Sequence, residues 1–391
     1  MLRSLERLSD HLAITPQEWE SLLNHEISSA PPVWKSVRTT LLRSALLAVH
    51  ARVRLLIAYS DLWLGAERSG EFHSALCELV RPCARKEIAV ASDERDVLIY
   101  WLRECLPHQK GIRFLLAWAL RLSPVDFQDE TLGVVLGNAS QRKTGYLFHA
   151  WLDVGLSVDA IRIAVVAWCL HFAKEIWFSY VAPTWLKHGG DPTVVAPYIP
   201  TWLELYAPAF EAQFVFTAWL DVTKDGALVQ SHLARWLELH DQTPEASFVF
   251  QAWLEATKDG ALVQPHLARW LELHDQTPEA NFVFKAWLDA TKDTVFVKTH
   301  LVRWLNVHAR DYDASFVICA WLTAGGNAGD LREPVRRWLA TQTSRADTSF
   351  VLIEWLTAGG DRAAVASDVD YCLLVKVNPK SCAWLAKLWA P

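Results

Sequence analysis

Residues 212–245 read AQFVFTAWLDVTKDGALVQSHLARWLELHDQTPE, and residues 246–279 read ASFVFQAWLEATKDGALVQPHLARWLELHDQTPE. The two segments differ at five of 34 positions. Each contains two Trp-Leu pairs, and the register continues on both sides as two tryptophan series with a 34-residue spacing: Trp151, Trp185, Trp219, Trp253, Trp287, Trp321, Trp355 and Trp389, and Trp168, Trp202, Trp236, Trp270, Trp304 and Trp338. A period of this length is typical of repeat architectures. We therefore predict a tandem-repeat fold.

Each unit has the pattern of two helices. Thr243 and Pro244 predict a helix start, with the threonine as N-cap and the proline in the first turn. The apolar run 248–254 covers most of a helix circumference and predicts the more buried helix of the pair. Gly260 follows as a breaker. Apolar residues spaced by three and four then predict a second helix, which begins near Pro265.

A single helix pair cannot bury its own apolar face, whereas stacked pairs bury a continuous core. We predict an all-α fold, a right-handed α-solenoid of about seven to eight two-helix repeats of 34 residues. Residues 1–110 lack the period and would form a non-repeat helical cap, a docking region or a small effector domain. The predicted units are 111–143, 144–177, 178–211, 212–245, 246–279, 280–313, 314–347 and 348–381, with a partial unit at 382–391. The tryptophans of both series up to Trp355 are the predicted structural core.

Composition fits a folded protein that lies in the cytoplasm. Apolar residues make up 52 % of the 391 residues and charged residues 21 %. The seven cysteines are an odd number without a CxxC pair, which favours free thiols in a reducing compartment. The N-terminus has no signal-peptide pattern. Arginines interrupt the apolar run 41–64, so we expect neither a membrane span nor a membrane partner.

Charge is distributed unevenly along the chain. The net charge is −6, with +1 in residues 1–120 and −7 in residues 121–391. Nucleic-acid binding depends on neutralising phosphates, so we do not expect a nucleic-acid partner for this array. The basic cluster of Arg81, Arg85 and Lys86 is interpreted as a solvated surface.

Catalytic and metal-binding patterns are lacking. We find no phosphate-binding loop, dinucleotide fingerprint, GxSxG or HExxH motif. Repeated units also give copies of a site and not the asymmetric pocket that an enzyme needs. Two histidines recur in each unit eight residues apart, which is too far for shared ligation of a metal on one helix, and we interpret them as structural. Another candidate zinc set matches no standard zinc spacing: His73, Cys77, Cys83, Cys105 and His108. We expect no enzyme activity, cofactor or metal.

Charged residues recur beside the tryptophans. Acidic residues follow the first Trp-Leu pair of three units, and arginines precede the second tryptophan of the same units. We predict structural ion pairs between these two sets: Asp221, Glu255 and Asp289 with Arg235, Arg269 and Arg303.

Positions that vary between otherwise identical units are the candidates for partner recognition. Thr217, Gln251 and Lys285 occupy one such position, and Ser231 and Thr299 occupy another. Varying residues on a constant scaffold can encode the choice of partner, and the alternative is neutral drift at exposed positions. We take these five residues as the predicted partner-binding set.

The 34-residue two-helix unit resembles the tetratricopeptide repeat in length, although the W-x2-L-G-x2-Y order is absent. The segment 189–203, GGDPTVVAPYIPTWL, resembles HEAT-type or armadillo-type units. The Trp-Leu arrays are also similar to the C-terminal helical repeat arrays of bacterial NACHT/STAND defence proteins, although this chain has no Walker A motif. These resemblances imply a helical-repeat architecture and, in the last case, a ligand-sensing role.

The function that we expect is a non-enzymatic protein-binding scaffold or adaptor, which binds a protein or peptide along a concave or groove surface. One alternative is a sensor or regulatory subunit of a bacterial defence or signalling system. Another is a nucleic-acid-binding repeat protein with one unit for each base. The array ends within a unit, so we also expect self-association through its C-terminal end.

Overall fold

The computed structural model describes residues 99, 113–342, 344–345, 347–375 and 378–390. Within these residues the chain forms 17 α-helices, four short 3-10 helices and no β-strand, which confirms the all-α prediction. None of the described helices combines the length and apolarity needed to cross a membrane. Residues 1–98 and 100–112, with the predicted cap and the candidate zinc residues, lie outside the described part.

The chain divides into two compact units. The described helices of unit 1 are α8 (Arg113–Leu122), α9 (Pro124–Gly137), α10 (Gly145–Asp153) and α11 (Val158–Phe172). The helices of unit 2 are α12 (Phe178–Lys187), α13 (Ile199–Tyr206), α14 (Ala212–Thr223), α15 (Gln230–His240), α16 (Ala246–Thr257), α17 (Gln264–His274), α18 (Ala280–Thr291), α19 (Thr294–His308), α20 (Ala314–Thr323), α21 (Arg332–Gln342), α22 (Thr348–Thr357), α23 (Ala366–Val375) and α24 (Pro379–Trp389).

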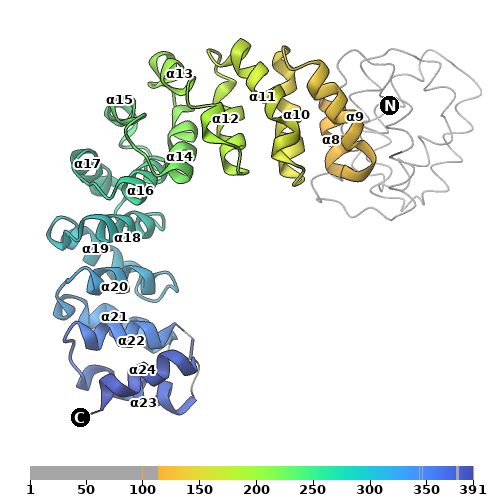
Figure 1. Cartoon of the computed structure of the whole chain (residues 1–391). Helices are drawn as coiled ribbons and strands as arrows, with labels where there is room; N and C mark the ends of the chain where they lie inside the picture. Colours follow the sequence, from red (N-terminus) through yellow and green to blue (C-terminus); the bar gives the residue numbers. More distant parts are fainter. Residues whose placement is uncertain (1–98, 100–112, 343, 346, 376–377, 391) are drawn as a thin grey trace, which may run out of the picture. The chain divides into compact units, whose positions relative to one another are not determined.

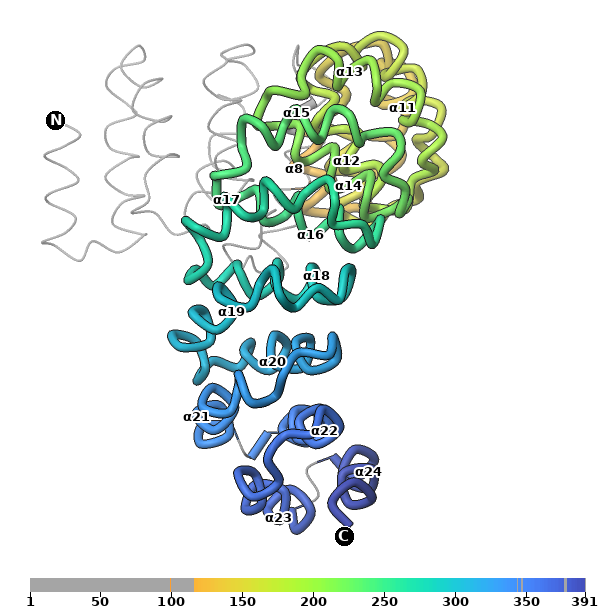
Figure 2. Tube along the Cα trace, turned by 90° about the vertical axis from the view of Figure 1, so that its left-hand side faces the viewer, coloured from red at the N-terminus to blue at the C-terminus, as the bar shows by residue number. Residues whose placement is uncertain are grey.

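The helices of unit 2 form two layers (Figures 1 and 2). Each even-numbered helix from α12 to α22 packs against the next even-numbered helix, and we call this series the first-helix layer. The odd-numbered helices α13 to α23 lie on the other side and form the second-helix layer. Two helix layers therefore enclose the apolar core of this unit.

Tryptophan side chains fill the core. The thirteen tryptophans from Trp151 to Trp355 in the two series are between 0 and 6 % exposed. On the first helix, Trp253 donates its indole N–H to the carbonyl of Asp259, 2.9 Å away in the following loop. On the second helix, Trp270 donates to the carbonyl of Thr243, 2.9 Å away in the preceding connection. These two indoles therefore fill the core and also anchor a loop.

The structure contradicts one of the two predicted helix starts and confirms the other. Helix α16 begins at Ala246, so the predicted start at Thr243 and Pro244 is wrong. The Thr243 hydroxyl donates to the carbonyl of His240, 2.9 Å away, which makes this residue part of the connecting turn. Helix α17 begins at Gln264 with Pro265 in its first turn, as predicted.

Candidate partner-binding surface

An aromatic side chain is exposed on every helix of the first-helix layer, near the start of α12 to α22 and in the middle of α24. The exposed fraction of these residues is between 40 and 57 %, and successive members are 34 residues apart. Single exposed apolar residues are normal, but a row of them on adjacent helices marks an interaction surface. We call this row the aromatic stripe, and it consists of Tyr180, Phe214, Phe248, Phe282, Phe316, Phe350 and Trp384.

The first helices carry a second aromatic row on their buried side. Phe250 is fully buried and meets Trp270 edge-to-face, with ring centroids 6.3 Å apart. Phe248, two residues earlier, is 57 % exposed. The two rings differ because two residues along a helix point to nearly opposite sides. Helix α16 has more buried residues than α17, as predicted for the first helix of the pair. An aromatic residue recurs at both positions in the central part of the chain, so recurrence in the sequence does not separate the exposed row from the buried one.

A groove lies between neighbouring members of the stripe, on α12, α14 and α16. Its volume is about 330 Å³. Phe214 and Phe248 line it together with the predicted residues Thr217 and Gln251. The charged residues that line it are Lys187, Asp221 and Glu255. The groove therefore combines aromatic and hydrogen-bonding side chains with two carboxylates and one lysine.

The structure places the predicted partner-binding residues on both layers. Thr217, Gln251 and Lys285 lie on α14, α16 and α18, each three residues after a member of the aromatic stripe. Ser231 and Thr299 are exposed on α15 and α19, in the second-helix layer. The first three residues therefore share a layer with the stripe, and the last two do not.

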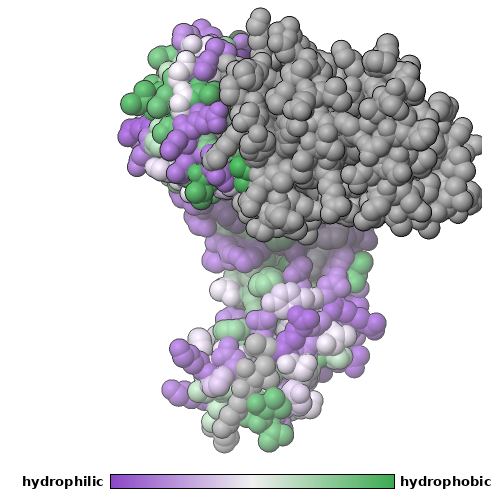
Figure 3. Space-filling view, turned by 90° about the vertical axis from the view of Figure 1, so that its right-hand side faces the viewer, coloured by the Kyte–Doolittle hydropathy of each residue, from purple (hydrophilic) through white to green (hydrophobic). Residues whose placement is uncertain are grey.

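The acidic charge is concentrated in the first-helix layer. The first helices α12–α22 with their flanking residues contain 14 Asp or Glu and five Lys, a net charge of −9, in segments 177–191, 211–225, 245–259, 279–293, 313–327 and 347–361. The intervening second-helix segments contain ten Asp or Glu and eleven Lys or Arg, a net charge of +1, in 192–210, 226–244, 260–278, 294–312, 328–346 and 362–378. Figure 3 shows a largely hydrophilic described surface that hydrophobic patches interrupt.

The carboxyl group of Asp221 is partly removed from water in the groove. Loss of hydration is the main cause that raises its pKa above the ordinary value. Lys224 and Lys187 lower the pKa and Glu255 raises it, but the net shift is upward. A cation placed beside Asp221 and Glu255 would relieve this energetic cost.

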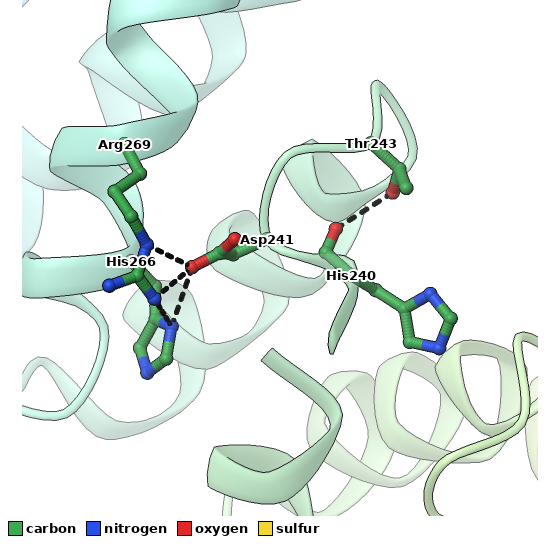
Figure 4. A network of polar contacts seen from close by, with 5 residues as sticks. All are labelled: His240, Asp241, Thr243, His266 and Arg269. Atoms are coloured by element: carbon green, nitrogen blue, oxygen red, sulfur yellow. Dashed lines mark hydrogen bonds and ion pairs between the residues drawn. The ribbon is translucent and has the colours of Figure 1, made fainter. Parts of the chain in front are cut away.

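The second-helix layer contains a polar cluster around the buried Asp241 (Figure 4). Asp241 is 3 % exposed, and its Oδ2 accepts from His266 Nδ1 at 2.8 Å and from Arg269 Nε at 2.7 Å. The pairing predicted for Arg269 with the acid after the first Trp-Leu pair is wrong. Glu255 instead accepts from Gln251, 2.8 Å away on the same helix.

An equivalent cluster lies 34 residues further along the chain. Asp275 accepts from His300 Nδ1 at 2.8 Å and from Arg303 Nη1 at 2.7 Å. Asp289 instead binds Lys285 at 2.7 Å, so the predicted Asp289–Arg303 pair is also wrong. Among the described residues, no group of three or more His, Cys, Asp or Glu side chains could hold a metal ion. We interpret the two clusters as ties between consecutive second helices.

Comparisons with known proteins give no family for this chain. No protein-family model, no curated protein and no solved structure matches it. The candidate surface is therefore defined by the arrangement of its own residues.

Proposed function

We propose that this protein is a non-enzymatic helical-repeat scaffold that binds a protein or peptide along its first-helix layer. The observation that carries the proposal is the aromatic stripe, whose seven members are each at least 40 % exposed. Burying a phenylalanine side chain is worth about 1.5–3 kcal/mol, so several such rings would give a partner substantial binding energy.

We further propose that the scaffold is a right-handed α-solenoid of 34-residue, two-helix units. The hydrogen bond from Trp253 to Asp259 has equivalents 34 residues away on either side, which supports this assignment. Trp219 donates to the Asp225 carbonyl at 3.0 Å, and Trp287 donates to the Asp293 carbonyl at 2.9 Å. Stacked repeats of this kind expose extended binding surfaces.

The residues beside the stripe offer a means of selecting the partner. Thr217, Gln251 and Lys285 occupy equivalent positions, but their side chains differ in size and charge. Constant aromatic residues would then supply affinity, while the varying residues would discriminate between sequences. The charge of −9 on this layer disfavours nucleic acid on the same face, because phosphates would be repelled.

A peptide-display selection tests the proposed function. A library that covers the proteome of the native host is selected on the full chain and on two double variants. The first variant, Phe248→Ser with Phe282→Ser, alters the stripe. The control, Leu239→Ser with Leu273→Ser, alters side chains on α15 and α17 that are 61 and 60 % exposed.

We expect the full chain and the control to enrich the same peptides and the stripe variant to lose them. Equal enrichment by all three proteins would contradict binding at the stripe. Absence of any enriched sequence with the full chain would remove the support for a peptide-binding function.

A further inference from the structure

We infer that the aromatic stripe binds a basic segment of another protein in the polyproline II conformation, with an apolar residue at every third position. This inference rests on the proposed function and names the chemistry of its partner. Three features support it: the spacing of the stripe, the polar groups between its rings and the charge of the surrounding layer.

The spacing of the stripe fits a polyproline II chain. Its members occupy equivalent positions on helices that pack against one another, and packed helices are about 8–10 Å apart. A polyproline II chain advances about 9.3 Å in three residues, so every third side chain would meet the next ring. A β-strand repeats the same face every 6.6–6.8 Å or so, which falls out of register after one or two rings.

An α-helical ligand also has a suitable repeat, about 10.5 Å for seven residues. The groove favours the extended ligand because polar side chains separate its aromatic rings. Thr217 and Gln251 lie beside Phe214 and Phe248 in the groove. Thr217 Oγ1 donates to the Gln213 carbonyl at 2.9 Å and Gln251 Nε2 donates to Glu255 at 2.8 Å, which leaves one amide hydrogen of Gln251 and the acceptor lone pairs of Thr217 for a ligand. A polyproline II backbone has no internal hydrogen bonds and can pair with these groups, whereas the backbone of a helix is already satisfied.

The charge of the layer favours a basic ligand. Acidic residues stand three positions before each central ring of the stripe, on the same side of the helix. A second acidic row follows seven positions after three of these rings. The two rows are Glu211, Glu245, Glu279, Asp313 and Asp347, and Asp221, Glu255 and Asp289. Lysine or arginine side chains would lie between these rows, where they would also meet aromatic faces.

The charge at the variable position differs between units. Lys285 binds Asp289 at 2.7 Å, so α18 already holds its own cation. At the equivalent position, α16 has Gln251, which is neutral and donates to Glu255. Glu255 therefore has no counterpart of the lysine that binds Asp289. We therefore place the basic side chains of the ligand over α14 and α16.

Fluorescence anisotropy with synthetic probes tests the inference on the full chain. The main probe is a labelled 15-residue peptide that repeats leucine, proline and lysine. Three further probes serve as controls: the same composition in an order without the three-residue period, the repeat with glutamate in place of lysine, and an amphipathic helical peptide of leucine and lysine. We expect the main probe to bind most tightly and its affinity to fall as salt concentration rises.

Matched variants locate the binding site. Phe248→Ser with Phe282→Ser should weaken binding by at least about tenfold, since each aromatic anchor contributes 1 kcal/mol or more. Glu245→Gln with Glu255→Gln should weaken binding and reduce its salt dependence. Circular dichroism checks that both variants fold, and Phe248→Tyr should preserve binding.

Two control pairs on the second-helix layer should bind the probe as the unaltered chain does. These are Leu239→Ser with Leu273→Ser, and Glu238→Gln with Glu272→Gln, all at exposed positions. Loss of binding in these controls equal to that in the stripe variants would overturn the inference.

The probes separate the remaining outcomes. If the reordered peptide binds as tightly as the main probe, the three-residue period is contradicted. If the glutamate peptide binds as tightly, the preference for a basic ligand is contradicted. Tighter binding of the helical peptide would identify a helical occupant and overturn the polyproline II assignment. If no probe binds while peptide display enriches sequences that depend on the stripe, the inference fails and the proposed function stands. If display also enriches nothing, both fail.

Discussion

Gly226 lies against the indole ring of Trp253, and a β-carbon on this glycine would come within 2.8 Å of Cζ3 of that ring. Gly260 has the same relationship with Trp287, again at 2.8 Å. The loop after one first helix therefore packs directly on the tryptophan of the next first helix. The Asp-Gly pairs that interrupt the helices are thus also part of the core between neighbouring helices.

Gly226→Ala should destabilise the protein. The added methyl group would force Trp253 or the loop to move, and such overpacking costs about 1–3 kcal/mol. Thermal unfolding followed by circular dichroism measures the change. The control is Gly133→Ala on α9, where a β-carbon would meet nothing within 4 Å. The control should be neutral or stabilising by up to about 1 kcal/mol, because alanine favours helix.

Trp253→Ala should lower the free energy of unfolding by about 3–5 kcal/mol, because it removes a buried indole and leaves a cavity. Trp253 is 3 % exposed, whereas Trp384 is 56 % exposed. Trp384→Ala and Gln251→Ala should therefore have much smaller effects in the same denaturation experiment. Equal losses in the three variants would contradict the assignment of Trp253 to the core.

Asp241→Asn should weaken the tie between α15 and α17. The change removes the negative charge that His266 and Arg269 share, and hydrogen bonds to charged groups contribute about 1.5–3 kcal/mol. Arg269 is 49 % exposed, so salt should reduce the difference. Urea unfolding at low and high salt measures both effects. Glu238→Gln, at an exposed position on α15, is the control and should change stability little.

Asn281→Ser should stabilise the protein by about 1 kcal/mol. Oδ1 of Asn281 is buried and has no hydrogen-bond partner in the described structure. At equivalent positions, the hydroxyl of Ser247 donates to Pro244 at 2.7 Å and that of Ser315 donates to Tyr312 at 2.8 Å. The reciprocal change, Ser247→Asn, should be destabilising. If the denaturation midpoints of the two variants shift in the same direction, the unpaired oxygen of Asn281 does not explain the difference in stability.

Cys169, Cys319 and Cys372 should react slowly in the folded state. Burial raises the pKa of Cys169 and of Cys319 from 9.0 to about 12, and that of Cys372 to about 11. The thiolate is the reactive form, so alkylation at pH 8 should be far slower than for an ordinary thiol. Mass spectrometry after timed alkylation, with and without denaturant, measures this protection. Rapid labelling of the folded chain at these residues would contradict it.

The same pKa shifts predict the effect of alkaline pH on stability. The raised values favour the protonated thiols of the folded state, so this stabilisation is complete below pH 9 and is lost as the pH rises toward 12. Cys169→Ala should therefore flatten the decline in unfolding free energy over this range, as measured by denaturant titration at a series of pH values.

Much of the local structure could be predicted from the repeat. The start of α17 at Gln264, with Pro265 in its first turn, follows from local apolar spacing and proline geometry. The start of α16 could not be predicted in this way. A threonine at this place in a sequence is compatible both with an N-cap and with a turn. In the structure, the Thr243 hydroxyl donates to the His240 carbonyl, which assigns it to the turn.

The candidate site was only partly predictable for a related reason. Thr217, Gln251 and Lys285 stand out because they vary, and variation is visible in a sequence. The exposed aromatic rings beside them are invariant through the central units and could not be distinguished from core residues. Asp241, the partner of Arg269, lies 28 residues before it, and only the packing of consecutive second helices brings the two together.

The sequence by itself determined the helical class, the approximate positions of the helices and the tryptophan period, because these depend on the spacing of residues along the chain. Tertiary structure decided which side of each first helix is exposed. Phe248 and Phe250 are chemically identical and both belong to an apolar run, yet one is 57 % exposed and the other fully buried. Their difference arises from where the neighbouring helices pack, and that depends on contacts between units and not on the pattern within one.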